Sequence, residues 1–165
     1  MSTLSTTAPL LDLARRFRFN ESLLANVTRG FQADDWAARP PVGGNNPVWI
    51  LGHVAHSRRF LVRRLGDGSP MESWEADFGM GTQPRDPAAY PSPATLLEWF
   101  RLAGEALERL CRNLDEAAVR QPFGTTFPDG SDTLGAGAAF LYMHEVYHIG
   151  QVGLLRRMRG RPGFA

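Results

Sequence analysis

The sequence has no lysine and only one cysteine, and both shortages exclude chemistry. All 18 basic residues of the 165-residue chain are arginines, so a lysine Schiff base and the lysine of a phosphate-binding P-loop are excluded. Cys111 alone can form no internal disulfide and cannot build a cysteine-rich zinc finger. The formal net charge is only +1, a balance that gives no indication of nucleic-acid binding.

Long apolar runs are also missing, which argues against a membrane-spanning helix and against a secretory signal. The most apolar segment, residues 133–155, contains two histidines and a glutamate, so we do not expect it to span a membrane. The first residues, MSTLSTTAPLLDLARRF, have no basic region before their apolar residues and are unlike a secretory signal. We therefore expect a cytoplasmic protein, and the length suits one domain over residues 1–165.

Four segments carry helical periodicity, and no series of strands accompanies them. Pro9 and Pro47 lie near the starts of the first two, and Gly30 and Gly66 follow their ends. The expected helices cover residues 10–29, 47–65, 94–114 and 131–158. Ser131 or Asp132 is the expected N-cap of the last helix. Four long helices joined by long crossover loops predict an all-α four-helix bundle.

The four histidines form two pairs, and one pair has the spacing of metal ligands. His144 and His148 are four residues apart, so they lie on one face of a helix. The other residues of that face are mainly apolar and predict burial: Phe140, Leu141, Gln151, Leu155 and Met158. Two buried imidazoles need partners, and one metal ion would satisfy both. Two separately hydrogen-bonded core histidines are the alternative.

A metal site needs a third protein ligand, and the second helix offers one. His53 lies at the flank of the apolar stripe of that helix, so it is the candidate. His56 lies on the opposite side, together with Arg59 and Arg63, and is expected at the surface.

The stretch His144-Glu145-Val146-Tyr147-His148 matches the H-E-x-x-H motif of zinc proteases, but the chain lacks the rest of that site. No aspartate, glutamate or histidine follows His148, so the downstream third ligand of those proteases is missing. Glu145 lies about 100° around the helix from His144. It is a candidate for orienting a ligand histidine or for proton transfer, and a surface carboxylate is the alternative.

Other residues near the expected site admit two interpretations. Trp74, Phe78 and Met80, in the long loop of residues 66–92, either line an entrance or pack as a cover. Arginines on the two histidine-bearing helices can hold an anion, although we expect solvated helix faces. These arginines are Arg58, Arg59, Arg63, Arg64, Arg156 and Arg157. Cys111 is expected to be a core residue.

Two segments resemble the signature segments of the DinB/YfiT-like family: NPVWILGHVAHSRRFLVRRLG (46–66) and FLYMHEVYHIGQVGLLRRMRG (140–160). The matching residues are Trp49, His53, His144, His148, Gly150 and Gln151. FGMGTQP (78–84) is similar to the interhelical loop of the family. The resemblance implies an up-down-down-up four-helix bundle, a three-histidine site for a divalent metal and a homodimer. Relatives include thiol-dependent transferases and isomerases, and many members have no known activity.

Three imidazoles would leave positions on the metal open to water or substrate. Zinc, nickel and iron all suit such a ligand set. Activated water predicts a hydrolase, and a bound low-molecular-weight thiol predicts an S-transferase, each acting on a small molecule. We expect the transferase first. The alternative is a non-catalytic protein in which the metal holds the bundle together or serves in stress response, and it predicts that no cavity reaches the metal.

Overall fold

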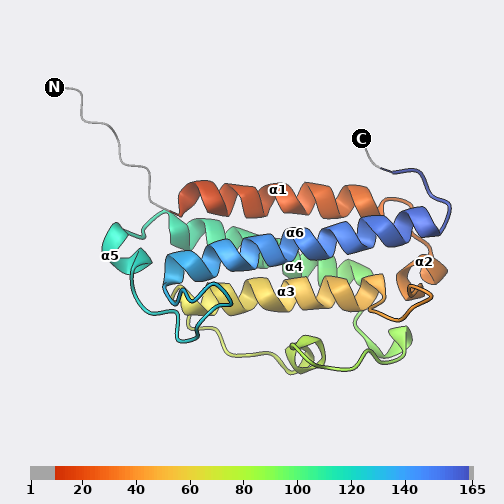
Figure 1. Ribbon diagram of the computed structural model, residues 1–165, viewed down its shortest axis with the longest axis horizontal. Helices are drawn as coiled ribbons and strands as arrows, with labels where there is room; N and C mark the ends of the chain where they lie inside the picture. Colours follow the sequence, from red (N-terminus) through yellow and green to blue (C-terminus); the bar gives the residue numbers. More distant parts are fainter. Residues whose placement is uncertain (1–9, 164–165) are drawn as a thin grey trace.

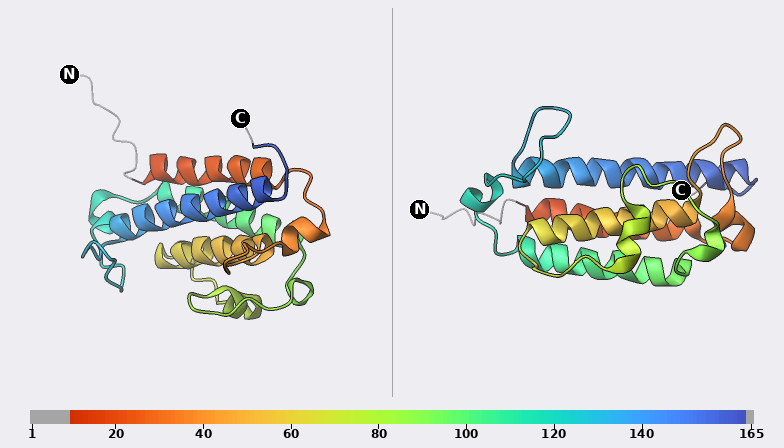
Figure 2. Two further views of the ribbon diagram at one scale, coloured as in Figure 1. Left: turned by 45° about the vertical axis from the view of Figure 1, so that its right-hand side comes forward. Right: turned by 90° about the horizontal axis from the view of Figure 1, so that it is seen from below.

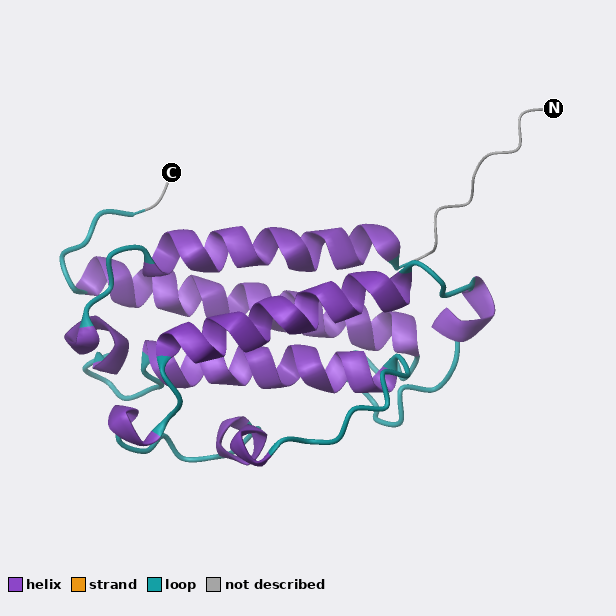
Figure 3. Cartoon of the chain, turned by 180° about the vertical axis from the view of Figure 1, so that it is seen from behind, coloured by secondary structure: helices purple, strands orange, loops and turns teal. Residues whose placement is uncertain are grey.

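The protein is a bundle of four long helices, seen in a computed structural model that describes residues 10–163 (Figure 1). The long helices are α1 (Leu11–Thr28), α3 (Pro47–Arg64), α4 (Pro93–Cys111) and α6 (Leu134–Met158). Short helices lie in the connections: α2 (Ala33–Ala37), η1 (Ser73–Phe78), η2 (Pro87–Ala89) and α5 (Glu116–Val119). No strand occurs within residues 10–163, so the predicted all-α bundle is confirmed (Figure 3).

Each long helix packs against two others, so the four surround one core. Helix α1 contacts α4 and α6, and α3 contacts the same two. In Figure 1, α1 and α6 run from left to right, whereas α3 and α4 run from right to left. Two further views show the long helices side by side, with the connections at the ends and along α3 (Figure 2).

The helices begin where the sequence predicts, with one exception. Pro47 and Pro93 occupy first-turn positions, and the preceding Asn46 and Ser92 cap them with side-chain oxygens. The last helix was expected to have Ser131 or Asp132 as its N-cap, and this is wrong, because Thr133 caps it.

The reason lies in the segment before α6. The carbonyls of Ser131 and Asp132 accept hydrogen bonds from the amides of Phe127 and Phe123, at 2.8 Å and 2.6 Å. Both residues are therefore held in a turn that folds back on residues 123–127, and the helix begins after it.

The core is apolar at both ends of the bundle and polar in the middle. One apolar cluster includes Leu24 of α1 and Val152 of α6, and the other includes Phe17 and Leu141 of the same two helices. Cys111 is buried in the second cluster, as expected. Between the clusters lie buried charged side chains, which belong to the site described below. Within residues 10–163, no helix is long and apolar enough to cross a membrane, and the cytoplasmic location stays a prediction.

Candidate metal centre

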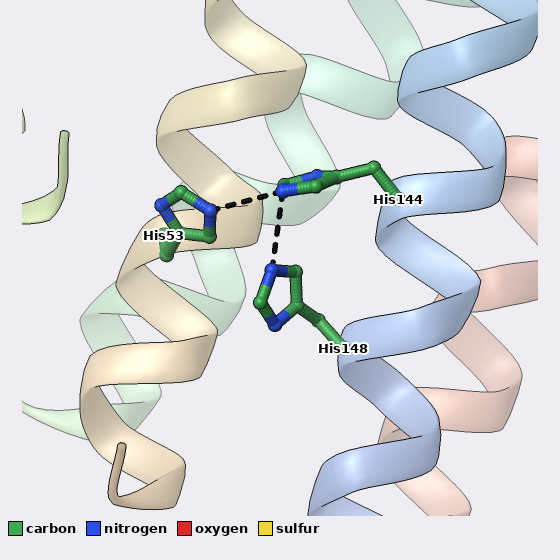
Figure 4. A group of neighbouring side chains, drawn as sticks. All are labelled: His53, His144 and His148. Carbon is green, nitrogen blue, oxygen red and sulfur yellow. Dashed lines mark hydrogen bonds between the residues drawn. The ribbon is translucent and has the colours of Figure 1, made fainter. Parts of the chain in front are cut away.

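Three histidine side chains from two helices point toward one another (Figure 4). The Nε2 atom of His144 on α6 lies 3.1 Å from Nε2 of His53 on α3 and 3.1 Å from Nε2 of His148. One ligand atom of each residue lies within 4.8 Å of the other two. Nitrogens at zinc–nitrogen bond length in a tetrahedral site are about 3.3 Å apart. The three residues predicted as ligands are thus brought together at a spacing that fits one ion.

Hydrogen bonds at Nδ1 determine the tautomers of His53 and His148. Nδ1 of His53 lies 2.6 Å from the carbonyl oxygen of Phe78, and Nδ1 of His148 lies 2.7 Å from Oε1 of Gln151. Both oxygens only accept, so both Nδ1 atoms carry the proton, and both neutral rings present an Nε2 lone pair inward. His144 carries at most one proton on its Nε2, which cannot satisfy both neighbours with a good hydrogen bond. A shared cation resolves this arrangement.

Burial keeps these imidazoles neutral. Loss of hydration lowers the pKa of His53 to about 4 and the pKa of His144 to about 4. It also lowers the pKa of His148. Nδ1 of His144 is buried and has no hydrogen-bond partner within the described residues. Neutral imidazoles are the form that binds a metal, so the site is prepared for one near pH 7.

Phe78, whose carbonyl bonds to His53, can pack against α3 because residue 52 is a glycine, a contact that the sequence alone did not predict. Phe78, at the end of η1, is fully buried, and its ring lies against Gly52 of α3. A Cβ on Gly52 would lie 2.2 Å from a ring atom of Phe78, so only glycine lets η1 approach the helix this closely. A glycine inside a helix, next to a candidate ligand, was the signal in the sequence that could have revealed this contact.

A second clamp on η1 is Glu75, whose side chain is completely buried. Its carboxylate accepts hydrogen bonds from Arg59 (3.0 Å), from Arg63 (2.8 and 2.9 Å) and from Nδ1 of His56 (3.2 Å). Burial acts to raise the pKa of Glu75, but the bonds from Arg63, the Glu72 amide and Arg59 lower the pKa to about 2. The carboxylate therefore ties η1 to α3 as an anion.

This clamp corrects the expectation for His56. The residue was expected in solvent at the surface, but only 17% of its side chain is exposed and its ring bonds to Glu75. His56 does face away from the apolar stripe of its helix, but η1 covers that side of α3. Helical periodicity cannot predict such a cover, because it comes from a loop about twenty residues away.

Glu145, the candidate for orienting a ligand or for proton transfer, faces away from the histidines into the polar middle of the core. Its Oε1 accepts from Asn20 at 2.8 Å and from Nη2 of Arg58 at 2.6 Å, and its Oε2 accepts from Nε of Arg58 at 3.0 Å. The side chain is 3% exposed, so the alternative of a surface carboxylate is wrong. These contacts give Glu145 a structural role, and none of them joins it to the three histidines.

Arg58 is the centre of that polar layer, and the expectation of a solvated side chain is wrong for it. Its side chain is fully buried, and all five N–H groups are used. Besides Glu145, it donates to Glu21 at 2.7 Å and to the carbonyls of Phe17 and Phe100 at 2.8 and 3.1 Å. The guanidinium also lies 3.5 Å from the ring centre of Phe100. Residue 58 lies four residues after Val54 and three before Leu61, on the buried face of α3, so its spacing predicts burial although its charge favours solvent. Side chains of three neighbouring helices enclose it.

The other arginines divide between pairing and exposure. Arg156 is also buried, so the expectation of a solvated side chain is wrong for it as well. Its guanidinium donates to the carbonyls of Arg29 and Pro162, both at 2.7 Å. Arg64 and Arg157 are exposed, as expected.

A cavity of about 530 Å³ lies beside the histidine cluster and is open to solvent. His53 and His144 contribute to its wall. Its other lining residues come from α3, from the loops and from α6: His56, Ser57, Phe60, Arg64, Met80, Gly124, Thr125, Phe127, Phe140 and Leu141.

Of the three residues in the long loop that were expected either to line an entrance or to pack as a cover, one lines the cavity and two are packed. Met80 lines the cavity, whereas Phe78 is buried and Trp74 stacks on Trp99 at 4.1 Å between ring centres. The long loop thus supplies one lining residue and two packed aromatic side chains.

Comparison with known proteins identifies the family of the chain. The family model described as the DinB superfamily matches residues 16–152, which includes both histidine-bearing helices down to Val152. No curated protein matches the chain. Because the match covers well over half of the sequence and the fold is a helical bundle, the chain belongs to the DinB superfamily.

Proposed function

We propose that this protein binds one divalent metal ion through His53, His144 and His148 and uses it to act on a small molecule. The observation that carries the proposal is the convergence of three Nε2 atoms, from two helices, beside a solvent-open cavity. The proposed reaction is S-transfer from a low-molecular-weight thiol to an electrophile, with metal-assisted hydrolysis as a variant. Zinc, nickel and ferrous iron all suit a site of three imidazoles.

When bound, such an ion supplies Lewis acidity, through which a thiol or a water molecule becomes a nucleophile near neutral pH. The chain's own residues do the rest. The Phe78 carbonyl and the Gln151 side chain hold two of the rings in the orientation that aims Nε2 at the ion. Phe60 and Phe140 in the cavity wall exclude water beside the site and receive an apolar part of the substrate.

Two features favour catalysis over a purely structural metal. The cavity gives a small molecule access to His53 and His144, which a structural site does not need. In addition, helices α3 and α6 are already joined by the buried Arg58–Glu145 ion pair, so the bundle does not depend on a metal to connect them.

The first test is metal binding. Protein purified without an affinity tag and stripped of metal is titrated calorimetrically with Zn²⁺, Ni²⁺ and Fe²⁺, and we expect one ion per chain. His148→Ala and His53→Ala should each lose most of the affinity, because two imidazoles remain. His56→Ala, which changes the fourth histidine of the chain, should keep the stoichiometry of one. Wild-type protein that takes up no ion would refute the proposal.

The second test is turnover. Metal-loaded protein is assayed with a thiol and 1-chloro-2,4-dinitrobenzene, and separately with 4-nitrophenyl acetate without thiol. Thiol-dependent turnover that is lost in folded His148→Ala supports S-transfer, and ester cleavage lost in the same variant supports hydrolysis. Equal rates in the variant and the wild type, in a protein that does bind metal, would leave the non-catalytic alternative.

We further propose a homodimer through the outer face of α6. Met143, Tyr147, Leu154 and Met158 are each about half exposed or more and lie at helical spacing on that face. The prediction that Met158 is buried is therefore wrong, because the residue ends α6 and is 48% exposed. An exposed apolar stripe of this kind marks an interaction surface. Sedimentation equilibrium should give a dimer for the wild type and a monomer for Leu154→Arg, with metal stoichiometry unchanged. A wild-type monomer would refute this assignment.

A further inference from the structure

The cavity beside the histidines is elongated along α3. His53, Ser57, Phe60 and Arg64 line it, and their spacing of four, three and four residues places them on one face of the helix. The backbones of His53 and Arg64 are therefore about 16 Å apart along the helix axis. One end of the cavity lies at the imidazoles and the other lies at an arginine.

Between these two ends the wall is largely apolar. Phe60 of α3, Phe127 of the loop before α6, and Phe140 and Leu141 of α6 lie along it. The rings of Phe127 and Phe140 are 4.9 Å apart between centres, so they form one continuous surface. Such a surface fits the body of an aromatic or aliphatic molecule and offers few partners to a sugar or a peptide backbone.

Arg64 is the cation at the far end, and within the described residues it has neither a hydrogen bond nor an ion pair. Its guanidinium carbon lies 5.1 Å from the ring centre of Phe60 and 5.6 Å from that of Phe123. The guanidinium also lies so close to Gly124 that a Cβ there would be 2.9 Å from Nη1. The aromatic rings and the glycine hold the head group of Arg64 at the cavity while leaving its donors unused.

The neighbouring arginines of α3 differ from Arg64. Arg58 is paired with Glu145, and both Arg59 and Arg63 are paired with Glu75. No carboxylate lines the cavity. An unpaired guanidinium beside an apolar wall attracts an anion, and its planar fork matches a carboxylate.

We propose that the substrate is a small organic carboxylate that lies along this cavity. Its carboxylate binds Arg64, its apolar body lies against Phe60 and Phe140, and its reacting end reaches the histidines. Only the position of the reacting end rests on the proposed function. Binding of the carboxylate by Arg64 needs no metal, so it is testable separately.

The test compares 4-phenylbutyrate with the uncharged 4-phenylbutanol on metal-free protein at pH 7.5, by ligand-observed NMR titration. At this pH the buried imidazoles are neutral and do not attract the carboxylate. We expect the wild type to bind the acid about tenfold more tightly than the alcohol, the size of one charge-assisted hydrogen bond. Arg64→Gln should bind both equally, with unchanged affinity for the alcohol.

Two further variants locate the effect. Arg16→Gln removes an exposed arginine of α1 that has no pairing partner within the described residues, so it makes the same change in net charge away from the cavity. It should behave as the wild type. Thr125→Trp, at an exposed position that lines the cavity, should weaken binding of both probes. No binding by the wild type, no preference for the acid, or equal losses in Arg64→Gln and Arg16→Gln would each overturn the inference.

Metal stoichiometry, measured on the same samples, separates this inference from the proposed function. A wild type that binds metal but shows no preference for the carboxylate refutes the inference alone. A wild type that prefers the carboxylate, and loses the preference in Arg64→Gln, but takes up no metal, refutes the proposed function alone.

Discussion

Gly52→Ala is expected to damage both the fold and the metal site, although it adds only a methyl group. The new Cβ would lie 2.2 to 2.4 Å from three ring atoms of Phe78, whose side chain is fully buried and cannot turn away. Overpacking of this kind destabilises by about 1–3 kcal/mol. Alanine regains up to ~1 kcal/mol of helix propensity, and weakening of the 2.6 Å bond from His53 to the Phe78 carbonyl loses roughly 1 kcal/mol. We expect a net loss of about 1–3 kcal/mol.

Metal affinity should fall as well, because the displaced Phe78 carbonyl no longer orients His53. Loss of such an outer partner lowers metal affinity by about 10–100-fold. The free energy of unfolding is measured by urea denaturation of metal-free protein, and the affinity by calorimetric titration. Gly150→Ala is the matched control, since a Cβ at this helical glycine meets nothing within 4 Å. It should stabilise by up to ~1 kcal/mol and leave metal binding intact. If both variants gave the same stability and affinity, the argument from Phe78 would be refuted.

Two further predictions concern charge. Arg58→Met leaves the carboxylates of Glu21 and Glu145 without their buried cation and should destabilise by about 3–5 kcal/mol in urea denaturation at pH 8. Because burial raises the pKa of both carboxyls, the variant should recover stability as the pH falls toward 5, and a loss that is the same at pH 5 and pH 8 would contradict this assignment. Metal affinity should stay constant from pH 7 to about pH 5.5 and fall below that, because burial lowers the pKa of all three imidazoles, to about 4 for His53 and for His144, and keeps the rings neutral in this range. Calorimetric titration across this range checks it, and a steep fall already between pH 7 and 6 would show imidazoles with ordinary pKa values near 6.5.

The sequence by itself determined where two of the long helices begin and that His144 and His148 share one face, whereas it gave His53 only as a candidate third ligand. Pro47 and Pro93 fix where two helices begin, because proline suits the first turn and no later one. The four-residue spacing of His144 and His148 places both on one face, and the apolar residues beside them predict that this face is buried. These are local properties, since each depends on residues within two or three turns of one helix.

Only the tertiary structure decided which partners the buried charged side chains have and which groups orient the imidazole rings of the site. His56 faces away from the apolar stripe of its helix, yet η1 covers it. Arg58 lies on the stripe, between Val54 and Leu61, and its charge is accommodated there because groups of three neighbouring helices bind it. The partners that compensate them, Glu75 and Glu145, lie 19 and 87 residues further along the chain. Periodicity gives the direction of a side chain relative to its own helix and contains no information on what another segment brings to meet it. The same holds for the Phe78 carbonyl, because a backbone group becomes a specific partner only once the chain has folded over it.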